Sequence, residues 1–168
     1  YGMHNSPGMR VGEFASRSGS VMAASDTFEI IVTGRGGHAS APHTTIDPVL
    51  ASAHVIVALQ SIVSRETDPL KSLVITVTTT HGGDAYNVIP NEVKLTGTVR
   101  TLLPETRDFA EKRLTEVASA AASLCGATAK VNYVRGYPVT FNHEQQTEFA
   151  VGVARKVAGE TAVNDNMA

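Results

Sequence analysis

The chain has 168 residues, with 14 Lys and Arg against 16 Asp and Glu, so its formal net charge is -2. This balance argues against a strongly basic nucleic-acid-binding protein. A single cysteine, Cys125, excludes an internal disulfide and any zinc site built from several cysteines. We expect Cys125 to be a small buried apolar residue.

No run approaches the roughly 18 consecutive apolar residues of a membrane-spanning helix, because Arg, Asp, His or Thr interrupts every apolar stretch. We therefore expect no membrane segment. The chain begins at Tyr1 without an initiator methionine and ends in a polar run, so we expect a piece of a longer protein. Because we expect the natural N-terminus to be missing, the localisation is open, and a cytoplasmic location is only the default expectation.

The first third of the chain predicts connecting structure, a strand and a helix. Residues 1–26 lack sustained periodicity, whereas alternating apolar residues predict a strand over 28–33 that ends at a glycine-rich loop. Asp47 before Pro48 predicts the start of a helix that reaches Arg65.

That helix carries two apolar stripes, one at positions 49, 53, 56 and 63 and a second at Val55, Leu59 and Ile62. One stripe is enough to cover a sheet. We expect the second stripe to meet a partner subunit, with a deeply buried helix as the alternative.

The remaining elements complete a recognisable order. Strands are predicted over 73–78, 93–100 and 129–133, a second helix over 104–124 ended by Gly126, and a last helix over 147–157. The order βαββαβ in about 110 residues predicts an α+β, ferredoxin-like sandwich, in which a four-stranded antiparallel sheet carries both helices on one face.

The segments that flank this unit do not fit inside it. We assign residues 26–137 to the βαββαβ domain, and residues 1–25 and 138–168 to two parts of a second, incomplete domain. The βαββαβ unit is then an insertion into that second domain.

Six histidines are candidates for chemistry: His4, His38, His43, His54, His81 and His143. None has zinc-motif spacing in a helix, so each taken alone favours a surface or structural role. His38 stands out because it follows Gly34-Arg35-Gly36-Gly37, a loop that lets backbone approach a ligand. A phosphate cradle is a weaker interpretation of that loop.

Two further polar residues are candidates. Arg100 ends a polar strand face, where it is either a solvated charge or a two-point clamp for a carboxylate. Asn87 is either a turn residue or a ligand contact. From these residues alone no reaction follows.

Several motifs in one order carry a resemblance to a family. They are YGMH at 1–4, GRGGHASAPH at 34–43, DP at 47–48, ALQSIVSR at 58–65, DAYNVIP at 84–90 and GTVR at 97–100. Together they resemble the hippurate hydrolase, indole-acetyl-amino-acid hydrolase and aminoacylase family of metal-dependent amidohydrolases. The resemblance extends over essentially the whole chain.

The resemblance implies a catalytic domain with two divalent metal ions and an inserted lid, or dimerisation, domain of split βαβ topology. It implies that His4 is a metal ligand and that His38 reaches the active site of the other subunit, where it stabilises the oxyanion. Asn87 is implied to contact the substrate, and Arg100 to bind the substrate's free carboxylate. The implied partners are a second copy of the chain and a small N-acyl amino acid.

The family's other metal ligands and its general base belong to motifs that this sequence lacks: Cys-x-His, a Glu-Glu pair, an acidic Glu-Asp motif and a later histidine. Asn166-Met167-Ala168 resembles the run just before the acidic motif. We therefore expect the isolated chain to be inactive and to bind no metal tightly, and the sequence does not choose among zinc, manganese, cobalt and nickel.

Two other functions stay open at this stage. One is an autonomous ferredoxin-like module for dimerisation or interaction, without a catalytic parent. The other, which the sequence favours least, is a small-ligand regulatory domain of the same topology.

Overall fold

The computed structural model describes residues 1–165 and divides them into two compact units. Unit 2 comprises Ala23–Val139, and unit 1 comprises Tyr1–Met22 with the described residues from Thr140 onward. The roles predicted for residues 1–25, 26–137 and 138–168 stay predictions. The motif prediction for Asn166-Met167-Ala168 lies outside the described residues.

Unit 2 is built on a four-stranded antiparallel sheet of β3 (Ala24–Thr33), β5 (Leu73–His81), β7 (Glu92–Thr101) and β8 (Thr128–Arg135), in the order β5-β7-β3-β8. Strictly alternating burial along β3 and β7 directs one face of each strand into the core. β5 and β8 are the two edges.

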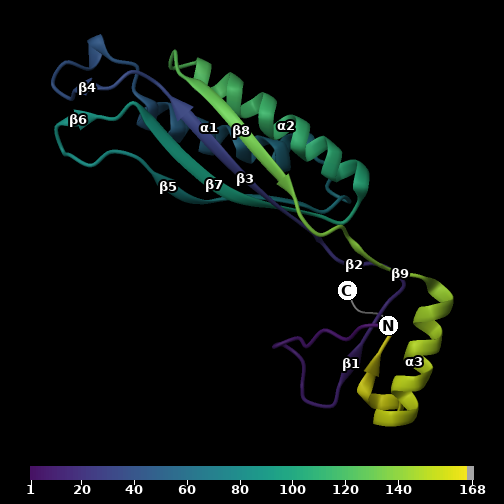
Figure 1. Cartoon of the computed structure of the whole chain (residues 1–168). Helices are drawn as coiled ribbons and strands as arrows, with labels where there is room; N and C mark the ends of the chain where they lie inside the picture. Colours follow the sequence, from purple (N-terminus) through teal and green to yellow (C-terminus); the bar gives the residue numbers. More distant parts are fainter. Residues whose placement is uncertain (166–168) are drawn as a thin grey trace. The chain divides into compact units, whose positions relative to one another are not determined.

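Both helices of unit 2 cover the same face of this sheet (Figure 1). α1 (Pro48–Ser61) continues as a π-helical turn, Ile62–Glu66, and packs over β7, β3 and β5. α2 (Pro104–Ser123) packs over β8, β7 and β3. The predicted ferredoxin-like α+β fold is confirmed.

Local signals explain where these helices begin and end. The Asp47 carboxylate accepts hydrogen bonds from the backbone N–H of Val49 (2.8 Å) and Leu50 (3.3 Å), as its capping role predicts. Gly126 follows α2 with a φ of 73°, which suits glycine. Cys125 is only half-buried beside the core.

The prediction for the two apolar stripes of α1 is wrong in its assignment. Val55, Leu59 and Ile62 are fully buried in the core. Of the first stripe, Val49 and Ala53 are exposed, and the members at positions 56 and 63 are partly buried against the core. Periodicity establishes that two stripes exist, but it does not say which of them faces the sheet.

The continuous helix Pro48–Glu66 is long and apolar enough, by length and composition alone, to cross a membrane. Single polar residues within an apolar stretch therefore do not exclude a helix of this kind. The two apolar stripes account for this composition, because one of them packs in the core of unit 2.

Unit 1 is small and contains short pairings. β1 (Phe14–Ala15) pairs with β10 (Val163–Asn164), β2 (Gly19–Met22) pairs with β9 (Thr140–Asn142), and α3 spans Glu144–Ala158. The predicted last helix lies inside α3. The prediction of connecting structure over residues 1–26 missed β1, β2 and the beginning of β3.

Candidate functional site

The residues singled out by the sequence lie in three places, the first of which is the end of the unit 2 sheet where β3 finishes and β7 begins. Here β4 (Gly37–His38) pairs antiparallel with β6 (Val88–Ile89), with Gly37 opposite Ile89 and His38 opposite Val88 (Figure 1). We call residues 34–46 and 82–91 together the tip.

The glycines of the tip are required by packing within the chain. A Cβ on Gly34 would lie 2.1 Å from the carbonyl oxygen of Ile46, and one on Gly36 would lie 2.4 Å from that of Ile89. The close backbone approach inferred from the glycine run therefore exists, but it is to neighbouring backbone of the same chain.

The tip brings His38 and Asn87 together. The N–H of Ala39 donates to the carbonyl of Asn87 at 2.9 Å, which ties the residue after His38 to Asn87. Both side chains are exposed. The Nδ1 of His38 is hydrogen-bonded by Ser40, through its N–H at 3.1 Å and with its hydroxyl at 2.7 Å.

Arg100 lies at the other end of β7, where it pairs with Ser25 and Val74. Its Nη1 donates to the Thr98 hydroxyl at 2.5 Å and to the Val99 carbonyl at 3.2 Å. The side chain borders a hollow of about 480 Å³ on the sheet face opposite the helices, together with threonines and Asn132. The hydrogen bonds hold the guanidinium beside this hollow.

One chain cannot bring Arg100 and the tip to the same small molecule. Glu92, at the tip end of β7, is eight residues from Arg100, which is about 27 Å in an extended strand. The structure therefore unites His38 with Asn87 and separates both from Arg100.

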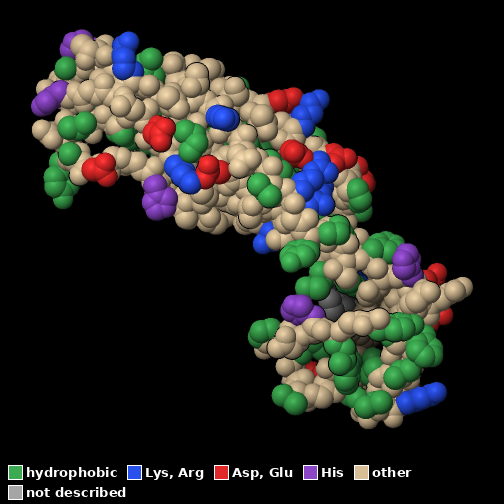
Figure 2. Space-filling model, in the orientation of Figure 1, with side chains coloured by type: hydrophobic (Ala, Val, Ile, Leu, Met, Phe, Trp, Pro, Cys, Tyr) green, Lys and Arg blue, Asp and Glu red, His purple; other side chains and the backbone are tan. Residues whose placement is uncertain are grey.

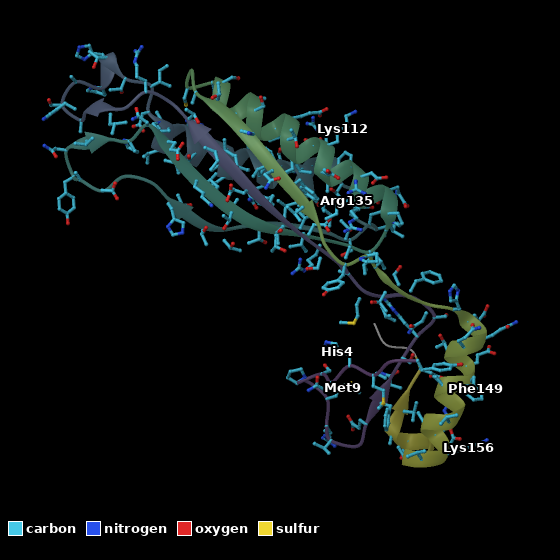
Figure 3. The ribbon with its side chains drawn as sticks, viewed as in Figure 1. His4, Met9, Lys112, Arg135, Phe149 and Lys156 are labelled. Carbon is cyan, nitrogen blue, oxygen red and sulfur yellow. The ribbon has the colours of Figure 1, made fainter. Side chains whose placement is uncertain are left out.

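His4 belongs to the N-terminal segment of unit 1 (Figure 3). It is exposed, and its Nδ1 lies 2.7 Å from the carbonyl oxygen of Asn5. Within residues 1–165 no three or more His, Cys, Asp or Glu side chains gather as metal ligands. His4 can supply one ligand, and the described residues do not complete a metal centre.

The sequence interpretation missed a buried carboxylate, Asp26. It is 1% exposed and accepts hydrogen bonds from Arg107 Nε (2.9 Å), the Tyr133 hydroxyl (2.8 Å) and the Gly136 N–H (3.0 Å). Asp26, Phe28 and Ile30 are spaced two residues apart, so their side chains lie on the same buried face of β3. This spacing was the sequence signal for the burial of Asp26.

The protonation of this cluster follows from competing effects. Burial raises the pKa of Asp26, but the hydrogen bonds from Arg107, Tyr133 and Gly136 outweigh it and hold that pKa below the ordinary value. Burial, together with the hydrogen bond to Asp26, raises the pKa of Tyr133. Asp26 is therefore a charged carboxylate that holds α2 and β8 onto β3.

The described residues leave the β5 edge of the unit 2 sheet unpaired, and the helix over that half of the sheet has exposed apolar residues. β5 is the outer strand, and α1 is the helix on that half of the sheet. The exposed flank of α1 carries Val49, Leu50, Ala53 and Val57. We call β5 and these four residues the β5/α1 edge. Elsewhere, on the face seen in Figure 2, positive and negative side chains are interspersed.

A family model described as a peptidase dimerisation domain matches residues 23–123. Thermostable carboxypeptidase 2 of Saccharolobus solfataricus is 36% identical over 159 residues, which are 94% of this chain and 40% of that protein. Hippurate hydrolase of Campylobacter jejuni is 39% identical over 160 residues, 95% of this chain and 42% of that protein. The chain thus spans about two fifths of the relatives it matches.

A solved structure is also similar to this chain over nearly its whole length. The crystal structure of the YXEP protein of Bacillus subtilis, described as a dinuclear metal-binding peptidase from the M20 family, matches with a TM-score of 0.73 and 26% identity. The match covers 98% of this chain and 41% of that one.

Proposed function

Because this chain belongs to the family of peptidase dimerisation domains, we propose that it is the lid and dimerisation region, with flanks of catalytic domain, of a metal-dependent amidohydrolase. The reaction proposed for the parent enzyme is hydrolysis of the amide bond of N-acyl amino acids, of which hippurate is an example. The isolated chain is inactive in this proposal.

The observation that carries the proposal is the β5/α1 edge. An outer strand with unpaired backbone groups is a template for pairing with another strand, and α1, the helix over that half of the sheet, has exposed valines. A second copy that pairs through β5 covers both features and forms an eight-stranded sheet. A symmetric contact of this kind is the commonest way to form a homodimer.

This dimer would also bring Arg100 of one copy close to the tip of the other, although the two are far apart within one chain. Val74, near the start of β5, pairs with Arg100, whereas His81 at its end leads into the tip. When two β5 strands pair antiparallel about a two-fold axis, the start of one lies beside the end of the other. Arg100 of one copy then lies about two strand spacings, roughly 10 Å, from the strand that leads into the second copy's tip.

The proposed site is therefore shared between subunits. His38 and Asn87 come from one copy and Arg100 from the other. In this arrangement Arg100 binds the free carboxylate of the substrate by two parallel hydrogen bonds, Asn87 contacts the substrate, and His38 donates a hydrogen bond to the oxygen that gains charge when water attacks the amide carbonyl.

The names of the relatives support this substrate class. A carboxypeptidase and a hippurate hydrolase both release an amino acid with a free carboxylate from an amide. An arginine beside a hollow on the lid is suited to that shared group. The acyl group and the amino acid side chain stay open.

The proposal that the parent enzyme binds metal ions rests on His4 and on the similarity to the dinuclear metal-binding peptidase of Bacillus subtilis. His4 is proposed as one ligand, with the others supplied by catalytic-domain residues that this chain does not contain. When bound, divalent ions activate water for attack on the carbonyl. Zinc, manganese, cobalt and nickel are all compatible with the proposal.

Unit 1 supports a place within a larger domain. Among the described residues of unit 1 only Val151 is a buried apolar side chain, while Phe149, Val153 and Val157 on α3 are exposed. Phe149 is labelled on α3 in Figure 3. An exposed apolar helix face of this kind typically packs against another protein surface. This disfavours the alternative of an autonomous dimerisation module.

The first test is the oligomeric state of the chain, measured by sedimentation over a range of concentrations. We expect a dimer that Val57→Glu converts to a monomer, since a charge on the β5/α1 edge would be buried between copies. Ala120→Glu is the matched control, because Ala120 is an exposed apolar residue on α2, away from that edge. A monomeric wild type, or equal loss of dimer in both variants, contradicts the proposed interface.

The second test is activity. The purified chain is expected not to hydrolyse hippurate when zinc or manganese is added. Turnover at a rate that scales with chain concentration contradicts the assignment of the general base and the other metal ligands to residues outside this chain.

A further inference from the structure

His38 and His4, the two histidines with proposed roles in the active site, differ in their hydrogen-bond partners: a donor faces His38 and an acceptor faces His4. Each makes its bond through Nδ1, but His38 is paired with Ser40 and His4 with the carbonyl of Asn5. A neutral imidazole carries one proton, on Nδ1 or on Nε2, and the partner decides which.

At His38 the partner includes a backbone N–H. The N–H of Ser40 lies 3.1 Å from Nδ1, and a backbone N–H can only donate. Nδ1 must therefore be the acceptor, so the proton of the neutral ring is on Nε2. The Ser40 hydroxyl, 2.7 Å away, rotates and can donate to the same nitrogen.

A tight turn holds Ser40 in this position. The Ala41 N–H donates to the His38 carbonyl at 2.9 Å, which closes a β-turn over residues 38–41. The Ala39 N–H is taken by the Asn87 carbonyl across the tip. With these two donors engaged, the Ser40 N–H is the donor left to face the ring of His38.

At His4 the partner is a carbonyl oxygen, which can only accept. A hydrogen bond over the 2.7 Å between Nδ1 and the Asn5 oxygen therefore requires a proton on Nδ1. Nε2 of His4 then carries a lone pair directed away from that bond. Histidine ligands of metals typically have this arrangement, with one ring nitrogen donating to a carbonyl and the other free to coordinate.

The structure assigns opposite tautomers to the two rings: His38 is the Nε2–H tautomer, positioned by Ser40, and His4 is the Nδ1–H tautomer. Ser40 is thus a positioning residue, which acts through His38. The inference rests on the proposed function for its meaning, because a donor at Nε2 suits contact with an oxyanion and a lone pair at Nε2 suits a metal ion. Within the described residues Nε2 of His38 makes no internal hydrogen bond, so it is available to an external oxygen.

The test is nuclear magnetic resonance of the ¹⁵N-labelled chain at about pH 8, well above the ordinary imidazole pKa of about 6.5. Long-range ¹H–¹⁵N correlations from the ring carbons' protons show which nitrogen is protonated. We expect the Nε2–H pattern for His38 and the Nδ1–H pattern for His4. His143, an exposed histidine before α3 whose side chain makes no capping hydrogen bond, is the internal reference for an unconstrained mixture.

Two variants separate the contributions of the Ser40 hydroxyl and the Ser40 backbone N–H to the tautomer of His38. Ser40→Ala removes the hydroxyl and keeps the N–H, whereas Ser40→Pro removes both donors. We expect the preference of His38 for Nε2–H to weaken in the first and to fall to the mixture of His143 in the second, with His4 unchanged in both. Ser64→Ala, at an exposed serine near the end of the first helix, is the control for loss of a hydroxyl.

The wild-type spectrum decides the matter even if a variant fails to fold. An Nδ1–H pattern at His38, the same tautomer at both His4 and His38, or a His38 pattern equal to that of His143 overturns the inference. None of these readings requires dimerisation, metal or turnover. A failure here is therefore distinguishable from a failure of the proposed function, which the sedimentation test addresses.

Discussion

Arg107 and Asp26 form a two-point ion pair inside unit 2, with Nε donating to Oδ2 at 2.9 Å and Nη2 donating to Oδ1 at 2.5 Å. The carboxylate is 1% exposed and the arginine side chain 12% exposed. Arg107 belongs to the first turns of α2, and Asp26 lies near the start of β3. The pair therefore joins the second helix to the central sheet at a point that water barely reaches.

Replacing Asp26 by asparagine is expected to destabilise unit 2 strongly. The amide keeps the shape of the side chain but loses the charge and leaves donors of Arg107 and Tyr133 without full partners. Breaking a buried pair by removing one member costs about 3 to 5 kcal/mol. Urea denaturation followed by circular dichroism measures this loss.

Glu29→Gln is the matched control for that experiment. Glu29 pairs with Lys94 on the exposed face of the same sheet, where both side chains are more than a third exposed. Such a surface pair contributes about 0 to 1 kcal/mol. Equal losses in the two variants would contradict the structural role given to Asp26.

The pH dependence of stability is the second prediction. Because the folded-state pKa of Asp26 lies below its ordinary value of 3.8, the charged form stabilises the fold at pH values above 3.8. That contribution is lost as the pH falls through the folded-state pKa. The difference in unfolding free energy between wild type and Asp26→Asn should therefore be largest near pH 7 and shrink toward about pH 3. A constant difference over this range would show that Asp26 does not titrate as proposed.

Gly97 provides a third prediction, on packing in the central strand. A Cβ at this position would lie 2.2 Å from both the Phe28 ring and the backbone oxygen of Thr76. The neighbouring backbone cannot move without disturbing the sheet, so Gly97→Ala is expected to cost about 1 to 3 kcal/mol. Gly152→Ala is the control, because a Cβ on that α3 residue meets nothing within 4 Å. Thermal unfolding that ranks the two variants alike would contradict this account.

The elements that the sequence predicted well are those with sustained local patterns. Alternation along β5 and β7 and the cap at Asp47 depend on neighbouring residues, so they can be read directly from the chain. β2 and β9 could not be found in this way. They are three or four residues long, and Gly19 pairs with Asn142 across most of the sequence.

The same distinction applies to the candidate site. The motifs identified His38, Asn87 and Arg100, but their spacing in the sequence does not show that the first two meet at the tip and that the third lies at the far end of β7. Asp26 was missed because residues 1–26 were interpreted as connecting structure. The two-residue spacing between Asp26 and Phe28, which places both side chains on the same face of the strand, indicated that Asp26 is buried.

The last prediction separates the roles of His4 and His38 in the proposed parent enzyme. His4→Ala removes a proposed ligand and is expected to lower the bound metal measured by atomic absorption. His38→Ala removes a hydrogen-bond donor for the oxyanion and is expected to lower kcat about 10²- to 10³-fold with unchanged metal content. His143→Ala, at the exposed N-cap of α3, is the control and is expected to change neither quantity. Equal metal loss in the His4 and His38 variants would refute this division of roles, because a donor that reaches the site from another subunit has no reason to hold the metal.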